Sequence, residues 1–395
     1  MTKPRLLYVS PFTPMKSGIS DYSQILVYGL AKYFNITILI DNYKLSDKRL
    51  YKDFDVKIYG RGKINFNNYE YKIYNIGNNY QFHSYIYKIA LENPGMIILH
   101  DYILYHFFLG YYHGKENFFS NIYENNGSIG IYYIKNAIKK KKDLSDIHLA
   151  AKLPCNKEIL LKSKKIMVHS LYNFNKIKDI VQNNIACNSN KVKKINHIEL
   201  TGNIDGSISV IDKEHLFKRF NIPCDKLILA SFGIIQPTKL NHLICKVVKE
   251  LNKIYENNLV YVMVGEGNYT DSFIGDDIIK TGYVNLDEFN SFIIHCDLAF
   301  NLRYPSMGET SGSLIRIMGV GKPCIVIDDA WFSELPDDAV YKVKNENVEN
   351  EIFILLEKFI NNQEYFLKVG ENAKKYINEN HSIDKISKEI YEFLV

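Results

Sequence analysis

Residues 303–313 read Arg303-Tyr304-Pro305-Ser306-Met307-Gly308-Glu309-Thr310-Ser311-Gly312-Ser313, and they join the apolar run Leu298–Leu302 to an apolar helical segment that begins near Ser313. A strand, a small-residue turn and a helix in this order leave unpaired backbone N–H groups at the positive end of the helix, where a phosphate group can bind. Glu309 places a carboxylate at the mouth of the same loop, where it can accept hydrogen bonds from hydroxyl groups. The stretch therefore indicates an α/β fold with a loop for a phosphorylated, hydroxyl-bearing ligand.

Other segments of the second half repeat this strand-then-turn pattern. Leu227–Gly233 is a buried strand that ends in glycine, and Lys239 follows it after a Gly-x-x-x-Pro-x turn. Val262–Gly267 runs into a glycine turn, and Thr281–Val284 comes after it. A lysine or a glycine turn alone is a weak signal, because exposed lysines and such turns are common. The order and spacing of all these segments indicate that their loops serve one site.

The N-terminal half opens with a predicted β-α-β unit. Arg5–Ser10 is an apolar strand, a loop with Gly18 follows, and Ile36–Ile40 is the second strand after an amphipathic helix. Ser20 or Asp21 is expected to cap that helix. The Gly-x-Gly-x-x-Gly fingerprint is absent from the sequence, so NAD binding is not predicted.

A further predicted strand, Ile97–Leu99, ends in His100 and Asp101. Ligands of doubly wound sheets bind at the carboxyl ends of the strands, so His100 is a candidate site residue. The alternative is a structural histidine that packs on a neighbouring helix. Residues 166–170 form another strand with His-Ser at its end.

Composition indicates two domains without disulfides. The chain has 395 residues and 46% hydrophobic content, enough for two cores, and the turn-rich stretch Gly202–Ser207 places the boundary near residue 207. Its six cysteines are scattered without Cys-x-x-Cys, which is typical of a reduced chain. We find no metal-ligand spacing, no membrane-spanning apolar run and no signal-peptide pattern, and therefore expect a cytoplasmic protein without a metal.

Charge is divided unevenly along the chain. Residues 1–210 hold 29 Lys and Arg against 16 Asp and Glu, whereas residues 211–395 hold 20 against 28. The basic half includes Lys139–Lys142, and such a surface attracts anionic lipid headgroups. We therefore expect peripheral contact with an anionic membrane, at the inner face of the plasma membrane; the alternative is a set of solvated lysines. Nucleic acid is not an expected partner, because no nucleic-acid-binding motif is present.

Taken together, the segments around Glu309, Lys239 and Gly265 resemble the C-terminal domain of the retaining GT-B glycosyltransferases of family four, of the bacterial cell-surface polysaccharide type. In that family the loop and helix are followed by Gly-Lys-Pro and a short strand, here Cys324–Ile327. The resemblance implies two doubly wound Rossmann-like α/β domains that face a central cleft. The acceptor-side domain would span 1–206 and the nucleotide-sugar-binding domain 207–377, with the last helix, about 378–395, returning to the first domain.

Two positions depart from the family pattern. The family's second glutamate, five positions before the glycine of Gly-Lys-Pro, is replaced by Arg316, and the arginine of its Gly-Arg pair is replaced by Ile234. Arg316 has two interpretations: it reaches a phosphate or a sugar carboxylate, or it is a helix-surface arginine in a solvated ion pair. With Ile234 in place of arginine, Lys239 is left to neutralise the diphosphate, together with Arg303 or Arg316.

The resemblance also implies an activity and a set of site residues. We expect a metal-independent, retaining transferase that needs no cofactor and moves a sugar from a nucleotide-diphosphate sugar to a carbohydrate or lipid-linked glycan. The implied catalytic residues are His100, Glu309 and Lys239; the donor diphosphate and sugar would contact Gly18, Arg303, Thr310, Ser311, Gly312, Ser313 and Arg316; and the base would contact Tyr283 and Val284.

Two other functions stay open at this point. A nucleotide-sugar epimerase can share the two-domain fold and would rearrange the donor without an acceptor. A catalytically inactive sugar- or nucleotide-binding protein would bind a nucleotide without turnover. The missing glutamate and arginine, replaced by Arg316 and Ile234, make this alternative credible.

Overall fold

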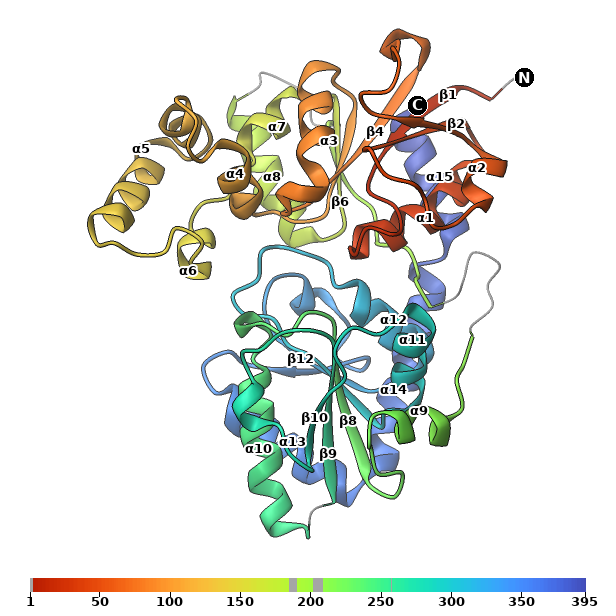
Figure 1. Cartoon of the computed structure of the whole chain (residues 1–395), viewed down its shortest axis with the longest axis vertical. Coiled ribbons are helices and arrows are strands. Elements are labelled where there is room, and N and C mark those ends of the chain that lie inside the picture. The colour runs from red at the N-terminus through yellow and green to blue at the C-terminus, as the bar shows by residue number, and fades with distance from the viewer. Residues whose placement is uncertain (1–2, 185–189, 202–208, 257) are drawn as a thin grey trace. The chain divides into compact units, whose positions relative to one another are not determined.

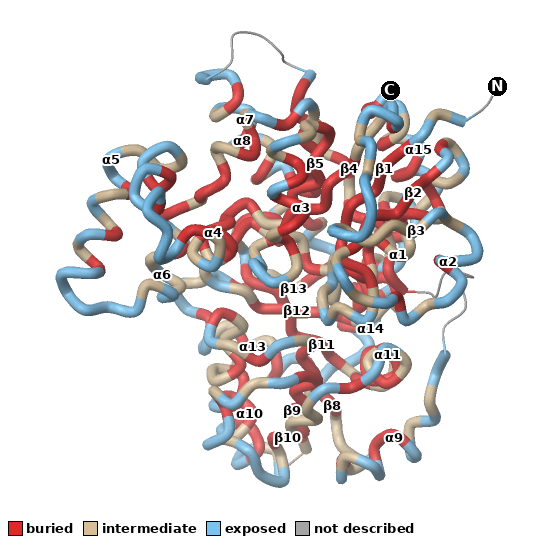
Figure 2. Tube along the Cα trace, turned by 45° about the horizontal axis from the view of Figure 1, so that its top comes forward, coloured by how far each residue is buried: buried red, intermediate tan, exposed pale blue. Residues whose placement is uncertain are grey.

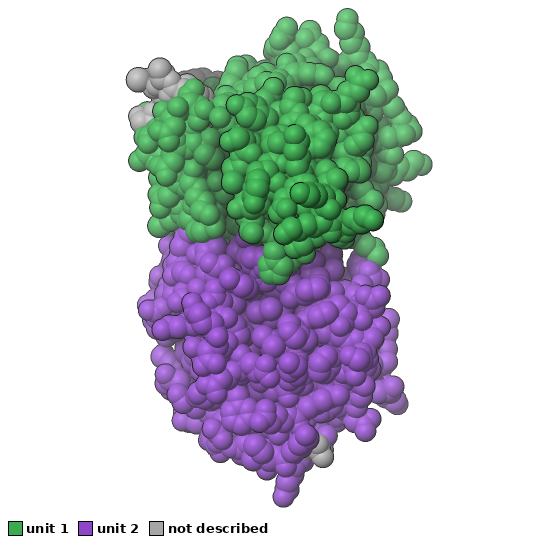
Figure 3. All heavy atoms as spheres, turned by 90° about the vertical axis from the view of Figure 1, so that its left-hand side faces the viewer, with its two compact units in different colours: residues 1–198, 307–310, 383–395 green, residues 199–306, 311–382 purple. Residues whose placement is uncertain are grey.

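The computed structural model describes residues 3–184, 190–201, 209–256 and 258–395. The chain forms two compact units, which are coloured separately in Figure 3. Unit 1 comprises residues 1–198, 307–310 and 383–395, and unit 2 comprises residues 199–306 and 311–382. The expected boundary at 206/207 and the turn-rich stretch Gly202–Ser207 lie outside the described residues.

Unit 1 is built on a parallel sheet (Figure 1), and its strand order is β3-β2-β1-β4-β5-β6-β7. Its strands are β1 Arg5–Val9, β2 Asn35–Ile40, β3 Asp55–Ile58, β4 Tyr71–Ile76, β5 Met96–Leu99, β6 Lys165–Val168 and β7 Val192–Lys194. Its helices are α1 Gly18–Leu30, α2 Arg49–Asp53, α3 Tyr80–Glu92, α4 Tyr105–Tyr112, α5 Phe118–Lys139, α6 Ile147–Ala150, α7 Lys157–Lys162, α8 Leu171–Asn184 and α15 Ile383–Leu394, with a 3-10 turn at Phe66–Asn68.

The last helix of the chain, α15, packs against α1 within unit 1. Gly29 of α1 allows this close approach, because a Cβ there would meet the side chains of Ile383 and Ser387. Lys32, two residues after α1, also pairs with Asp384 across 2.5 Å. The preceding helix continues to Asn380 in unit 2, so the chain enters unit 1 at Ile383 rather than near residue 378.

Unit 2 holds a second parallel sheet, with the order β10-β9-β8-β11-β12-β13. Its strands are β8 Leu227–Phe232, β9 Leu259–Val264, β10 Ile278–Lys280, β11 Leu298–Asn301, β12 Cys324–Ile327 and β13 Tyr341–Val343. Its helices are α9 Lys213–Arg219, α10 Asn241–Ile254, α11 Leu286–His295, α12 Gly312–Val320, α13 Val348–Asn361 and α14 Gln363–Asn380, with 3-10 turns at Pro237–Lys239, Asp271–Phe273 and Ala330–Glu334.

The two faces of this second sheet carry different helices. α10 packs against α13, whereas α12 packs against α11 and α14 (Figure 1). Right-handed crossovers require this, because β8-α10-β9 and β11-α12-β12 run in opposite directions along the sheet. The central strands of both sheets are buried on both faces, which explains their continuous apolar sequences (Figure 2).

The predicted α/β class with two doubly wound parallel sheets is confirmed. One finer prediction was wrong. The cap of α1 is Ser17, whose hydroxyl accepts from the Ile19 N–H at 3.2 Å, rather than Ser20 or Asp21. The first sheet continues past β6 to the short strand β7. Among the described residues no helix combines the length and apolar character needed to cross a bilayer.

The turns after β8 and β9 approach each other through their backbones. Gly233 N–H donates to Val264 O at 2.9 Å, and Ile235 N–H donates to Glu266 O at 2.6 Å. A Cβ on Gly265 would collide with the Gly233 carbonyl, so this glycine is needed for the close approach.

We therefore expect Gly265→Ala to lower the free energy of unfolding by about 1–3 kcal/mol, because the backbone of the β8 turn must shift. The matched control is Gly275→Ala, since a Cβ at Gly275 has its nearest neighbour, Asp277 Oδ1, at 3.8 Å. Urea denaturation of both variants measures the difference. Equal stability of the two variants would contradict the steric argument.

Candidate functional site

The candidate site of unit 2 lies where the strand order of its sheet reverses, between β8 and β11. The two strands pair in parallel, with Leu298 opposite Leu229 and Phe300 opposite Ser231, so their loops leave the same edge of the sheet. Ligands of doubly wound sheets bind at this switch point. A small pocket opens here, lined by Ser231, Phe232, Lys239, Ile244, Phe300, Asn301 and Leu302.

Lys239 supplies the positive charge of this pocket. It ends the 3-10 turn after β8, and its ammonium group donates to the Phe232 carbonyl at the end of that strand. A Cβ on Gly233 would lie 2.9 Å from Lys239 Nζ, so glycine at this position leaves room for the ammonium group. The structure thus places Lys239 at the switch point, as a phosphate-binding role requires.

The N-terminus of α12 lies beside the same pocket. Ser311 caps the helix by accepting from the Leu314 N–H at 3.3 Å, and its hydroxyl lies 3.1 Å from that of Ser313. Asn301, at the end of β11 in the pocket lining, donates to Ser313 Oγ at 2.9 Å. The first N–H groups of a helix have no partner within it, and here they begin at Gly312. Lys239 and Asn301 therefore line one pocket, and Asn301 also bonds the first turn of α12.

The structure rules out one of the two interpretations of Arg316. Its side chain is buried, with 4% exposure, and its guanidinium donates to the Leu200 carbonyl. A solvated arginine on the helix surface is therefore wrong, because the side chain is buried and bonds a backbone carbonyl. Its contact with a donor phosphate or sugar stays a prediction.

The remaining predicted residues of unit 2 occupy the same edge of the sheet. Arg303 follows β11 and is half-buried, whereas Ile234, at the family's arginine position, is exposed. Tyr283 and Val284 follow β10, and the tyrosine ring is 57% exposed while the valine is buried. An exposed aromatic ring is suited to stacking on a base.

The loop residues Met307–Thr310 belong to unit 1, unlike the flanking chain. Ile103 N–H, just past β5, donates to Met307 O at 2.9 Å, and Asn173 of α8 donates to Gly308 O at 2.5 Å. Glu309 Oε2 accepts from the Met307 N–H at 2.7 Å, so this carboxylate shapes its own loop. Thr310 Oγ1 is buried without a hydrogen-bond partner among the described residues.

His100 lies in a buried group of four rings that we call the histidine cluster: Tyr22, His100, His169 and His197. The Tyr22 ring centroid is 4.9 Å from His100, 5.4 Å from His169 and 4.7 Å from His197. His100 Nε2 lies 2.9 Å from Asn75 Oδ1. An amide oxygen only accepts, so Nε2 carries the proton and Nδ1 is an acceptor.

Burial makes this cluster electrostatically unusual. Loss of hydration, together with the nearby His169 and His197, holds the pKa of His100 well below its ordinary value. Loss of hydration also lowers the pKa of His83 to about 4, although its ring bonds the Asn75 carbonyl. His100 is therefore a neutral, mostly enclosed side chain, and its role in catalysis stays a prediction.

Gly18, the remaining predicted residue of unit 1, begins α1. A Cβ there would meet no atom within 4 Å, so the backbone borders open space as a ligand-facing glycine requires. The structure brings Gly18 and His100 to the same edge of the sheet, since α1 carries Tyr22 of the histidine cluster.

Several site residues had not been singled out from the sequence. Asn301 ends β11, and Asn241 and Tyr261 brace the pocket floor, with Tyr261 OH 2.7 Å from Ser231 Oγ and 2.8 Å from Asn241 Nδ2. Asparagine at the end of a buried strand was the available signal for Asn301. For the histidine cluster the signal was a histidine at or shortly after three successive parallel strands, β5, β6 and β7.

No protein-family model matches the chain, and no curated protein sequence matches it. Solved structures do. Anabaena HepE (Alr3699), crystallised with UDP-glucose, is 11% identical over 99% of both chains with a TM-score of 0.63. WaaG, a glycosyltransferase involved in lipopolysaccharide biosynthesis, is 10% identical over 99% of both chains with a TM-score of 0.61. A Listeria monocytogenes protein assigned as a UDP-N-acetylglucosamine 2-epimerase is 11% identical, over 98% of this chain and 95% of its own, with a TM-score of 0.50. At such low identity the likeness shows the fold: this chain has the two-sheet GT-B architecture.

The buried histidines predict a loss of stability in acid. The folded-state pKa of His83 lies below the ordinary 6.5. The contribution of the neutral His83 ring to the free energy of unfolding is therefore complete above pH 6.5 and is lost as pH falls toward 4. We expect His83 alone to lower the free energy of unfolding by about 2 kcal/mol between pH 7.5 and pH 5. In urea denaturation at both pH values, His83→Gln should lose correspondingly less stability than the wild type.

The matched control is His215→Gln on α9, where the side chain is exposed. This variant should keep the pH dependence of the wild type. An unchanged pH dependence in His83→Gln would show that the buried ring does not resist protonation.

Proposed function

We propose that this protein transfers a sugar from a nucleotide-diphosphate sugar to a carbohydrate or lipid-linked glycan, with retention of configuration and without a metal. The observation that carries the proposal is that Lys239 and Asn301 line one pocket at the switch point, where Asn301 also bonds Ser313 in the first turn of α12. An ammonium group and unpaired backbone N–H groups together suit a diphosphate. The GT-B fold shared with HepE and WaaG supports the same reading.

In this mechanism unit 2 stabilises the leaving group. As the bond between the anomeric carbon and the diphosphate oxygen breaks, Lys239 and the N–H groups near Gly312 and Ser313 take up the developing negative charge. The acceptor hydroxyl forms the new bond on the same face of the sugar. Its proton passes to the departing diphosphate, so no protein base is needed at the acceptor oxygen.

Unit 1 is proposed to act on the transferred sugar. Glu309 would accept hydrogen bonds from sugar hydroxyls through its carboxylate, which also accepts from the Met307 N–H. His100 would accept through Nδ1, the ring nitrogen opposite its bond to Asn75. Gly18 would let the backbone approach the diphosphate, as its open surroundings permit.

Two alternatives have support of their own. The Listeria epimerase-like structure favours a donor rearrangement, which would proceed without an acceptor. Ile234 and Arg316 stand where the family has an arginine and a glutamate at the donor. The loss of these two groups favours nucleotide binding without turnover. Acceptor-dependent release of the nucleotide distinguishes transfer from both.

The basic half of the chain supports a cytoplasmic location at an anionic membrane. Helix α5 exposes large apolar side chains, namely Phe119, Tyr123, Ile129, Tyr132 and Ile138. Lys135 and Lys139–Lys142 are exposed on and just after the same helix. Exposed aromatic groups beside lysines suit the interface of an anionic bilayer, where the acceptor lipid of polysaccharide synthesis would lie.

Donor binding is tested by thermal shift with UDP, GDP, dTDP, ADP and CMP and their sugar conjugates. UDP heads the series because HepE crystallised with UDP-glucose. A nucleotide at a hundred times its Kd should stabilise the protein by about 2.7 kcal/mol. Lys239→Ala should weaken the binding of that nucleotide by roughly 10- to 100-fold, because a charge-assisted contact of about 1.5–3 kcal/mol is lost.

The control is Lys253→Ala, an exposed lysine on α10, which should keep the full shift. Glu309→Ala should keep nucleotide binding and lose sugar transfer. If no nucleotide stabilises the wild type, or if Lys239→Ala binds and turns over normally, the proposed donor site is wrong.

Membrane contact is tested by cosedimentation with vesicles of phosphatidylcholine, with and without phosphatidylglycerol. Replacing Lys139–Lys142 by glutamine should weaken binding to the anionic vesicles at least about tenfold, because each lysine contributes about 1 kcal/mol. Tyr132→Ser on α5 should weaken it further. Tyr365→Ser, an equally exposed tyrosine on α14, should have no effect; loss of binding in that control, or none in the lysine variant, would contradict the assigned surface.

A further inference from the structure

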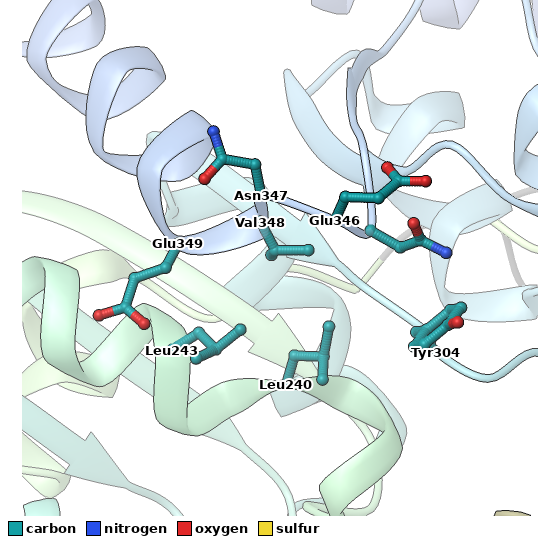
Figure 4. Close-up of a pocket in the computed structure, with 8 residues that line it drawn as sticks. Leu240, Leu243, Tyr304, Glu346, Asn347, Val348 and Glu349 are labelled. Carbon is teal, nitrogen blue, oxygen red and sulfur yellow. The ribbon is translucent and has the colours of Figure 1, made fainter.

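A second pocket of unit 2, of about 280 Å³, lies on the α10 and α13 side of the sheet (Figure 4). Its walls come from the segments that follow three strands: Leu240 and Leu243 after β8, Tyr304 after β11, and residues 345–349 after β13. It is therefore at the carboxyl edge of the sheet, like the pocket that holds Lys239. Crossover handedness places α12, with its phosphate-binding N-terminus, on the other face.

The floor of this pocket is apolar and its rim is polar. Leu240, Leu243 and Val348 converge at the centre, and the Tyr304 ring lies beside them (Figure 4). Tyr304 is 40% exposed, so part of its ring is available to a ligand. Around this floor stand two amides and two carboxylates, Asn345, Asn347, Glu346 and Glu349.

In the part of the chain that the structure describes, the rim side chains do not take part in the hydrogen bonds that shape the loop. Glu351, outside the pocket, closes the turn by accepting from the Lys344 N–H at 2.9 Å. Asn347 precedes α13 but makes no side-chain cap bond to it. Among the described residues, the Asn345, Glu346 and Asn347 side chains have no hydrogen-bond partner, and Glu349 makes only a half-exposed pair with Lys246 at 3.9 Å.

We infer that this pocket binds one sugar ring of a neutral or amino-sugar glycan. A pyranose has an apolar C–H face, which suits the leucine, valine and tyrosine floor, and a ring of hydroxyls, which suits amide and carboxylate acceptors. The volume is near the lower end for small ligands, about 300–1,000 Å³, and so has room for one ring rather than a nucleotide. Two carboxylates and no lining lysine or arginine disfavour phosphates and acidic sugars.

The pocket also has a defined place in the proposed reaction. Leu240 directly follows Lys239, and Tyr304 directly follows Arg303. The Tyr304 N–H donates to the Thr238 O at 2.8 Å, which ties the two segments together. A glycan held here lies beside the diphosphate site, so we assign the pocket as a subsite for the acceptor glycan. This assignment rests on the proposed transferase function, whereas sugar binding itself does not.

Ligand-observed NMR on the full chain tests the pocket with maltotriose, N,N′,N″-triacetylchitotriose and trigalacturonate at up to about 10 mM, enough to detect a Kd near 1 mM. Maltotriose or the chitotriose should bind, and trigalacturonate should not. Tyr304→Ala should weaken binding of the sugar about tenfold, and Glu346→Gln should also weaken that binding. Tyr365→Ala on α14 is the matched control and should bind normally.

Nucleotide thermal shifts on the same variants separate this proposal from the donor site. Tyr304→Ala and Glu346→Gln should keep the wild-type nucleotide shift, which also shows that they are folded, and should raise the acceptor KM about tenfold with kcat unchanged. Absence of sugar binding, preference for trigalacturonate, or normal binding by Tyr304→Ala overturns the subsite even if nucleotides bind. A missing nucleotide shift with intact, Tyr304-dependent sugar binding overturns the transferase instead.

Discussion

The parallel pairing of β8 with β11 is the constraint on which the proposed chemistry of unit 2 depends. These strands are neighbours in the sheet although two strands and two long helices separate them in the sequence. Their chains then leave toward opposite faces, so the edge between them stays uncovered by either helix. Lys239 and Asn301 stand at that edge because each ends or follows one of the two strands. The backbone bonds between the turns after β8 and β9 hold the lysine segment in place.

The charge at this edge is smaller than the family pattern would provide. Ile234 is exposed where an arginine is expected, and Arg316 is buried, with its guanidinium bonded to a carbonyl. Burial of an arginine is tolerated only when hydrogen bonds satisfy it, so Arg316 has a structural role in this arrangement whatever else it contacts. Lys239 and the α12 N-terminus are then the principal groups available for a diphosphate, which is why one lysine carries so much of the proposed function.

The sequence was sufficient for the elements and for part of the site. The strand ends at Leu99, Phe232 and Asn301, and the helix after Ser311, follow from local apolar runs and turn residues. Packing decided the rest. The burial of Arg316 depends on Leu200, more than a hundred residues away, and the histidine cluster depends on which strands are neighbours. The grouping of Met307–Thr310 with unit 1 likewise depends on Asn173 and Ile103, which no local pattern connects to that loop.

Crossover handedness also separates two kinds of chemistry on one edge of unit 2. On the α12 side, a lysine and a helix N-terminus gather positive charge suited to phosphate. On the α10 and α13 side, two carboxylates and two amides surround an apolar floor suited to a sugar face. A sugar nucleotide and its acceptor together present these two chemistries, an anionic diphosphate and neutral rings. The two sides meet where Lys239 adjoins Leu240. The fold therefore places a site suited to phosphate and a site suited to a neutral sugar one residue apart, and neither site has to bind the ligand of the other.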